Sequence, residues 1–145
     1  MPVTVKKIVL WRTEVDNKPG ILAGVLQPLA DAGANLQVLM GYRYPGDPGK
    51  AAIELCPVTG KKSLAAARAA GLEASSIPTL LVEGDNKPGL GASIARAAAD
   101  AGVNLAFLVA QVIGRKYSFV VGFETEDDAR KAAALIKKVT TGKKK

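Results

Sequence analysis

The pentapeptide Asp-Asn-Lys-Pro-Gly occurs twice in the sequence and groups residue types that can hold a charged small molecule. Its proline suits the first turn of a helix, where the missing N–H is not needed. The following glycine, Gly20 or Gly89, leaves the free N–H groups of that turn uncovered. With the helix dipole, these groups favour an anion such as a carboxylate. The amide of Asn17 or Asn86 can cap the backbone or offer its oxygen to an ammonium group.

The same turn is also a good structural cap for a helix, and asparagine after glycine is a common turn residue. The residues alone therefore leave a ligand site and a purely structural turn both open. Asp16 and Asp85, the first residues of the two pentapeptides, lie in separate copies and do not form a catalytic carboxylate pair.

A second segment, Ala-Asp-Ala-Gly-x-Asn-Leu, is also repeated and carries Asn35 and Asn104. Asn17 and Asn86 are 69 residues apart, and so are Asn35 and Asn104. A constant offset across two separate motifs indicates a duplicated unit. We therefore predict two domains, residues 1–74 and 75–145.

Each copy predicts the order strand, helix, strand, strand, helix, from apolar periodicity and turn residues. With a closing strand, this is an α+β fold of two ferredoxin-like βαββαβ units, with antiparallel sheets and helices on one face. The expected ranges in the first copy are strand 5–13, helix 19–32, strands 35–43 and 51–56, helix 62–70 and strand 72–76. Those in the second copy are strand 77–82, helix 88–101, strands 104–113 and 117–123, helix 126–138 and strand 139–141.

Three features should distinguish the copies. Pro28 lies inside the first helix, where Ala97 stands in the second, which predicts a kink near residues 24–28 and a better site in the second copy. The first hairpin should have a long turn at residues 44–50, and the second a tight Gly114-Arg115 turn. The apolar stretch 103–113 is too short to cross a bilayer and is expected to be a buried strand.

Composition argues against several classes of function. Three of the seven net positive charges come from Lys143–Lys145, and aromatic residues are few, so nucleic-acid binding is not expected. The single cysteine, Cys56, should be a packed small hydrophobe, and no apolar leader follows Met1, which favours the cytoplasm. With no histidine, phosphate-binding loop or metal-spaced cysteines, we expect no enzyme activity, no metal and no cofactor.

The pattern Asp-x-x-Pro-Gly-Ile/Leu, a helix, and then Ala-Gly-x-Asn-Leu, in a βαββα order, resembles the ACT domain. This family consists of small ferredoxin-like regulatory modules that commonly bind amino acids. The resemblance covers nearly the whole chain as two tandem copies. It implies a sensor whose ligand lies between paired domains near the first loop, with the helix N-terminus facing the carboxylate.

Within this family, the pattern is similar to the serine-binding regulatory domain of phosphoglycerate dehydrogenase, which uses the asparagines matching Asn17 and Asn35, and again Asn86 and Asn104. The histidine of that domain is replaced here by Val15 and Gly84, so the resemblance does not imply which amino acid binds. The candidate ligand-binding residues are Asp16, Asn17, Gly20, Ile21, Leu22, Asn35, Leu36, Asp85, Asn86, Gly89, Leu90, Gly91, Asn104 and Leu105.

The resemblance implies an amino-acid-responsive regulator that signals through assembly, as a homodimer, or through a regulated protein partner. The alternative is a ligand-free protein-interaction regulator resembling the tandem-ACT modulators of transcription factors. Membrane association is not expected in either case.

Overall fold

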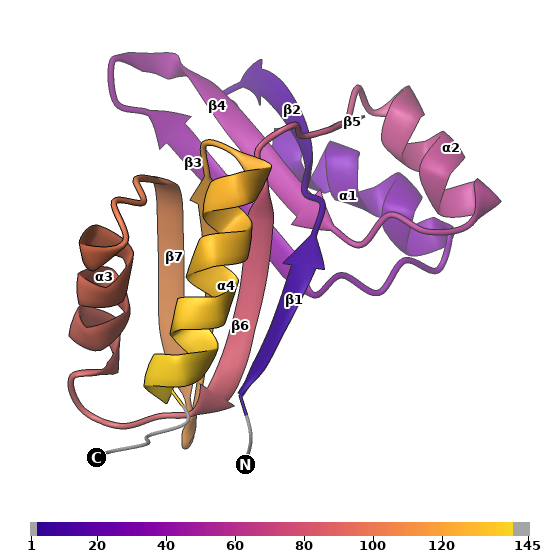
Figure 1. Ribbon diagram of the computed structural model, residues 1–145. Helices are drawn as coiled ribbons and strands as arrows, with labels where there is room; N and C mark the ends of the chain where they lie inside the picture. The colour runs from indigo at the N-terminus through magenta and orange to yellow at the C-terminus, as the bar shows by residue number, and fades with distance from the viewer. Residues whose placement is uncertain (1–2, 141–145) are drawn as a thin grey trace. The chain divides into compact units, whose positions relative to one another are not determined.

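The computed structural model describes residues 3–140, which divide into two compact units (Figure 1). One unit comprises residues 9–76, and the other comprises residues 77–140 together with residues 3–8. The division expected from the repeat placed the first strand with the first copy. In the structure, that strand pairs with the second copy.

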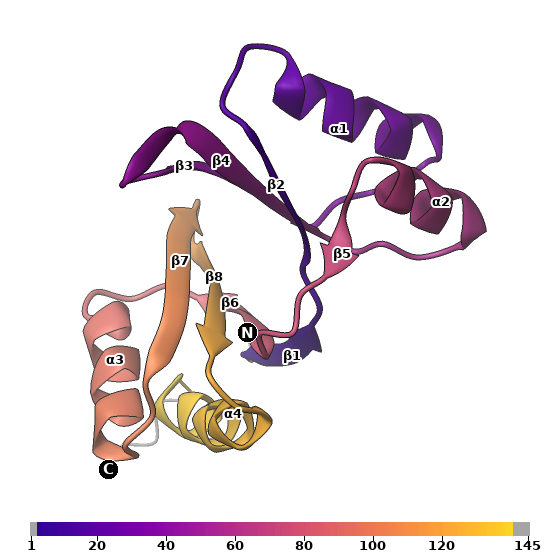
Figure 2. The ribbon, with the colours of Figure 1, turned by 90° about the horizontal axis from the view of Figure 1, so that it is seen from above.

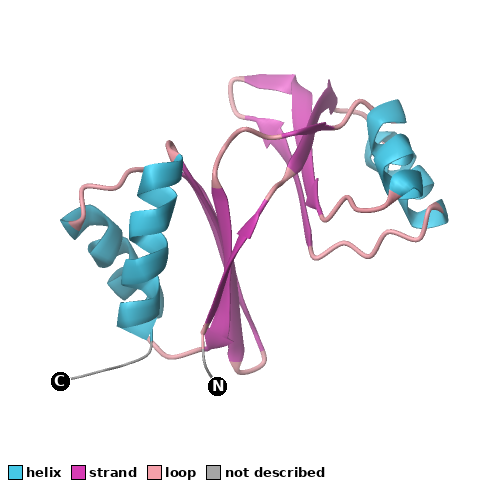
Figure 3. Ribbon diagram, turned by 45° about the vertical axis from the view of Figure 1, so that its right-hand side comes forward, coloured by secondary structure: helices cyan, strands magenta, loops and turns pink. Residues whose placement is uncertain are grey.

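The unit of residues 9–76 is an antiparallel sheet in the order β3-β4-β2-β5 with two helices. Both helices cover one face of the sheet (Figure 3). The order of strands along the chain and across the sheet is that of a ferredoxin-like unit. Its elements are β2 (Trp11–Asp16), α1 (Ile21–Asp31), β3 (Val38–Tyr44), β4 (Asp47–Cys56), α2 (Lys61–Ala69) and β5 (Glu73–Ala74).

The second unit has the sheet order β1-β6-β8-β7, again antiparallel. Helices α3 and α4 lie on the same side of this sheet (Figure 2). The predicted α+β fold of two ferredoxin-like units is therefore confirmed. The elements are β1 (Thr4–Ile8), β6 (Thr79–Asp85), α3 (Leu90–Asp100), β7 (Leu105–Ile113), β8 (Lys116–Phe123) and α4 (Glu126–Thr140).

Strand β1 takes the position in the second sheet that β5 takes in the first. It pairs antiparallel with β6, with Val5 opposite Val82. The expected strand 5–13 is thus two strands that belong to different sheets. The closing strand expected at 139–141 was wrong for residues 139 and 140, which continue α4, and Thr141 lies outside the described residues.

The first helix of each unit begins later than its proline. Gly20 and Gly89 are the N-cap residues, with φ of 89° and 82°, and the helices start at Ile21 and Leu90. Positive φ values are available to glycine at little steric cost, so Pro-Gly forms a turn before the helix rather than its first two residues. Helix α1 runs through Pro28 as one element.

Each unit has its own apolar core between helices and sheet. In residues 9–76, Val25 and Leu29 of α1 pack on Ile53 and Leu55 of β4. In the second unit, Ile94 and Ile136 of the two helices pack on the sheet with Phe123. The helical periodicity of apolar residues thus places one face of each helix on a sheet.

Two strand predictions need correction. Strand β4 begins at Asp47, so the first hairpin turns at Pro45 and Gly46 instead of through a long loop. Strand β7 is not buried, because it lies at a sheet edge with only β8 beside it. Among its side chains, Val109 is 48% exposed and Ile113 is 66% exposed. Cys56 is buried, as expected.

The helices of the described residues are all too short or too polar to span a lipid bilayer.

Candidate ligand-binding site

The repeated turn is attached to its sheet in the same way in both units. The backbone N–H of Asn17 donates to the Gly49 carbonyl at 2.9 Å, and that of Asn86 donates to the Arg115 carbonyl at 2.8 Å. Each bond joins the end of the first strand to the hairpin of the neighbouring pair. The turn is therefore held at a defined place beside the start of the helix.

An ion pair stands next to each turn. Lys50 Nζ donates to Asp16 Oδ1 at 2.9 Å, and Lys116 Nζ donates to Asp85 Oδ1 at 2.6 Å. The bond from Lys50 lowers the pKa of Asp16, and the nearby Lys18 ammonium lowers it further. The bond from Lys116 is the largest cause that lowers the pKa of Asp85 to about 2. Both aspartates are thus carboxylates at neutral pH.

The start of α1 has free donors. No side chain caps this helix. The Asn17 side chain instead donates from Nδ2 to the Pro48 carbonyl at 3.0 Å, which leaves its Oδ1 as an acceptor. Within residues 3–140, the N–H groups of Leu22 and Ala23 have no hydrogen-bond partner. Free N–H groups at a helix N-terminus form an anion site.

A hollow of about 210 Å³ lies beside this helix start, between the turn, α1 and the sheet. Its floor includes Gly41 of β3, which has no side chain, and Ala51 of β4, which has only a methyl group, and both leave space above the sheet. A Cβ built on Gly41 would meet no atom within 4 Å. The lining residues are Val15, Asp16, Asn17, Lys18, Ile21, Leu22, Gly41, Tyr42, Ala51, Ala52 and Ile53.

The charge around the hollow is net positive. Asp16 is neutralised by Lys50, whereas Lys18 makes no ion pair with any described residue. A surplus cation beside free helix N–H groups favours an anionic group on a bound molecule.

Four of the five residues predicted at the first turn line the hollow: Asp16, Asn17, Ile21 and Leu22. Gly20, the fifth, is the N-cap of α1. Asn35 and Leu36 are not brought to the hollow, because they follow the C-terminal end of α1. The helix has 11 residues and is about 16 Å long at 1.5 Å per residue.

The second unit arranges its asparagines in the same way. Asn86 precedes α3, and Asn104 follows it and donates from Nδ2 to Glu124 Oε2 at 3.2 Å. Leu105 is the first residue of β7. Gly89 is the N-cap, Gly91 is exposed in the first turn, and Leu90 is only 5% exposed in the core. Asn86 and Asn104 therefore lie beyond opposite ends of α3.

The sequence prediction missed the strand residues of the hollow, above all Gly41, Tyr42 and Ala51. They come from β3 and β4, far along the chain from the turn. Gly41 and Ala51 are small residues inside apolar strands, and such residues indicate space above a sheet. Only the strand register shows that this space lies beside the turn. Among the described residues, no cluster of acidic, cysteine or histidine side chains could hold a metal ion.

No protein-family model matches the chain, and no curated protein matches it in sequence. Among solved structures, protein BT0572 from Bacteroides thetaiotaomicron superposes with a TM-score of 0.76 at 16% identity. That match covers 94% of this chain and 90% of the other. The ligand-free regulatory subunit of aspartate kinase from Thermus thermophilus has a TM-score of 0.65 at 19% identity, covering 96% and 97%.

A third similar structure is aspartate kinase from Clostridium acetobutylicum, with a TM-score of 0.63 at 17% identity. The match covers 94% of this chain but 34% of that enzyme. At these identities the similarity concerns the fold. The chain has the fold of two tandem ACT-type units, and the resemblance seen in the sequence is confirmed at the level of the fold.

Proposed function

We propose that the unit of residues 9–76 binds an amino acid, or a closely related carboxylate, in the hollow beside the α1 N-terminus. The observation that carries this proposal is the combination of an uncapped helix start with an open hollow of about 210 Å³. A structural cap would use the side chain of Asn17 to satisfy the helix N–H groups. Here that side chain donates to Pro48 and leaves them free.

The carboxylate of the ligand would lie at the helix start. The N–H groups of Leu22 and Ala23 supply donors, and the Lys18 ammonium supplies charge. Hydrogen bonds to a charged acceptor are shorter and stronger than neutral ones. This end of the hollow therefore provides the larger share of the polar interaction.

The ammonium group of the ligand would lie toward the turn. Asn17 Oδ1 is an acceptor there, and the Asp16 carboxylate, whose charge Lys50 partly offsets, is a second one. Together with the helix start, these groups match the two opposite charges of a free amino acid. A simple carboxylate would use only one end of the site.

The ligand side chain would rest on the sheet. Val15, Ile53 and Ile21 make this part of the hollow apolar, and Gly41 and Ala51 set its depth. A small aliphatic side chain fits such a surface better than a charged one, because an unpaired charge there would lose hydration without gaining a partner. Roles for Asn35, Leu36, Asn104 and Leu105 stay predictions.

We further propose that the ligand regulates assembly or a protein partner. The regulatory subunit of aspartate kinase among the similar structures supports a regulatory role, since it has this fold without a catalytic domain. A homodimer is supported by the exposed apolar edge of β7. A ligand shifts such an equilibrium only by its differential affinity for the two states.

A thermal-shift panel of the twenty common amino acids tests the proposal. A ligand selective for the folded state raises Tm in proportion to the logarithm of its excess over Kd. We expect one or a few aliphatic amino acids to raise Tm with increasing concentration, and Asn17→Ala to reduce that rise while keeping the circular dichroism spectrum. A flat panel for the intact chain would contradict the proposal.

A second candidate function is a ligand-free protein-interaction regulator. The observation that favours it is β7, a long uncharged edge strand with exposed Leu108, Val109, Val112 and Ile113. An exposed strand edge can pair with a strand of another chain. A flat amino-acid panel together with stable association through β7 would favour this candidate.

A further inference from the structure

Ala51 and Tyr117 occupy the same register position in the two sheets. Ala51 lies opposite Val15, and Tyr117 lies opposite Gly84. In each case the next pair toward the turn is the aspartate–lysine ion pair described above. The two positions are therefore structural equivalents beside the repeated turn.

The residue sizes at these equivalent positions are exchanged. The first unit has a medium and a small side chain, Val15 and Ala51, and the hollow lies above them. The second unit has no side chain at Gly84 and a large one at Tyr117. A Cβ built on Gly84 would lie 2.9 Å from Tyr117 Oη and 3.0 Å from a ring carbon. The tyrosine ring thus lies against the backbone of Gly84.

Tyr117 is enclosed within its own unit. Its side chain is 5% exposed and belongs to the core cluster of that unit. The ring stacks on Phe119 with the centroids 5.6 Å apart. At the helix start, Leu90 is 5% exposed, whereas its equivalent Ile21 is only half-buried beside the hollow. Side chains of the protein itself therefore fill the space beside the second turn, although α3, like α1, has no side-chain cap and the N–H groups of Gly91 and Ala92 have no hydrogen-bond partner within residues 3–140.

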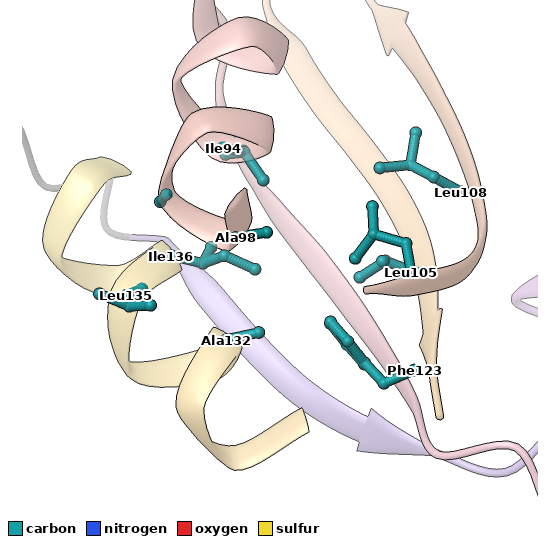
Figure 4. Close-up of a pocket in the computed structure, with 10 residues that line it drawn as sticks. Ile94, Ala98, Leu105, Leu108, Phe123, Ala132, Leu135 and Ile136 are labelled. Atoms are coloured by element: carbon teal, nitrogen blue, oxygen red, sulfur yellow. The ribbon is translucent and has the colours of Figure 1, made fainter. Parts of the chain in front are cut away.

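A different pocket in the second unit does not replace the hollow. Figure 4 shows it between α3, α4 and the sheet, where Ile94, Leu105 and Phe123 point into it. Its volume is about 10 Å³, and none of its ten lining residues comes from the repeated turn. This space is a small packing gap in the apolar core.

We infer that the Tyr117 side chain fills, in the second unit, the space that a ligand takes in the first unit. Each chain therefore binds one ligand. The number of ligands per chain rests on the proposed function, whereas the packing of Tyr117 does not depend on it. Gly84 is the positioning residue, because any side chain at that position would push the ring out. The second unit therefore keeps the fold of the first unit, but a side chain of its own takes the place of the hollow.

One experiment tests the packing without any ligand. Tyr117→Ala should leave an enclosed space of the shape of a phenol ring, and p-cresol, which has the structure of the tyrosine side chain, should fill it. We expect p-cresol to raise the Tm of this variant in a concentration-dependent way and to leave the Tm of the intact chain unchanged. No difference between the two proteins would overturn the inference.

If Tyr117→Ala does not fold, the inference can be tested by introducing the tyrosine and glycine at the equivalent positions of the first unit. Ala51→Tyr alone should lower Tm, because the ring meets the Val15 side chain. Adding Val15→Gly should recover part of that loss and abolish the response to the amino acids that stabilise the intact chain. A double variant no more stable than Ala51→Tyr would overturn the equivalence of the two positions.

Ligand stoichiometry separates the two proposals. Isothermal titration with the amino acid that gives the largest Tm rise should show one molecule per chain. Two molecules per chain would overturn the role of Tyr117 and leave the proposed function intact. A flat amino-acid panel would contradict the proposed function, while the p-cresol result would still decide whether Tyr117 fills the equivalent space.

Discussion

Tyr42 donates a hydrogen bond of 2.6 Å to Glu54 Oε2, and this bond satisfies one oxygen of a carboxylate that is only 5% exposed. The other oxygen, Oε1, has no hydrogen-bond partner in the described chain. Arg12 Nε lies 3.9 Å from Oε2. Burial and the bonded carboxylate together raise the pKa of Tyr42, so its hydroxyl remains a donor at neutral pH.

Tyr42→Phe should lower the free energy of unfolding by about 1–3 kcal/mol, because a buried charged acceptor then loses its donor. Urea denaturation measures the change. Tyr44→Phe is the control, since Tyr44 donates a bond of the same length to the exposed Glu14, although its hydroxyl also accepts a bond from Arg12. Water can replace that donor, so the control should lose less. Equal losses would contradict the importance of burial.

Gly41→Val should remove ligand binding without destabilising the protein. The new side chain would enter the hollow, where a Cβ meets nothing within 4 Å, and valine is favoured in strands. Amino-acid titration and thermal unfolding of the same variant measure both effects. Ala110→Val, at the equivalent position of the closed unit, should leave binding unchanged. Retained binding in Gly41→Val would place the ligand elsewhere.

The Asp85–Lys116 pair predicts a pH dependence at low pH. The pKa of Asp85 is lowered from 3.8 to about 2 in the folded chain, so its ionisation stabilises the fold fully above about pH 4. That contribution should disappear as the pH falls through about 2. The Asp85 carboxyl signal in an NMR titration gives the pKa directly. Lys116→Met should move it up toward 3.8, and an unchanged midpoint would contradict the assignment.

Pro28→Ala should raise the free energy of unfolding by up to about 3 kcal/mol, because proline inside a helix cannot donate to the carbonyl four residues earlier. Thermal unfolding measures the effect. The converse change at the equivalent position, Ala97→Pro in α3, should destabilise by a similar or larger amount. If Pro28→Ala proves neutral, α1 already accommodates the proline without loss.

Val109→Lys should weaken dimerisation by roughly tenfold or more, equivalent to about 1.4 kcal/mol. Val109 is 48% exposed on the edge strand β7, and charged side chains on an edge oppose strand pairing between chains. Sedimentation velocity over a concentration series measures the change. Thr4→Lys on β1, the opposite edge of that sheet, should have no effect. A native chain that remains monomeric throughout would rule out the dimer.

The fold could be predicted because the sequence repeat gave the same order of elements in two independent copies. Two motifs at one offset defined the duplication, and the apolar periodicity within each copy defined the order of elements. The helix starts were misplaced by two residues at Pro19 and Pro88, because the glycine after each proline adopts a positive φ that the proline rule does not anticipate. Four of the residues predicted at the first turn, Asp16, Asn17, Ile21 and Leu22, line the hollow.

The assignment of β1 could not be predicted from the local pattern. Residues 5–13 were predicted as one β-rich strand, and only the pairing of β1 with β6 reveals that its first part belongs to the other sheet. The same limit applies to the site. Whether the turn faces a hollow depends on Ala51 or Tyr117 across the strand pair, and that relation requires the register. Because a hollow lies beside the first turn, we expect the first copy to bind more tightly, whereas the proline in its helix had favoured the second copy.

The pairing of Val5 with Val82 makes the segment of residues 9–76 an insertion within the other unit. A gene fragment encoding residues 9–76 would supply all four strands of its own sheet. A fragment starting at residue 77 would instead leave the backbone of β6 unpaired along one side. During synthesis, β1 must wait for β6 to emerge, and the pairing of β2 with β5 holds the two ends of the intervening segment together.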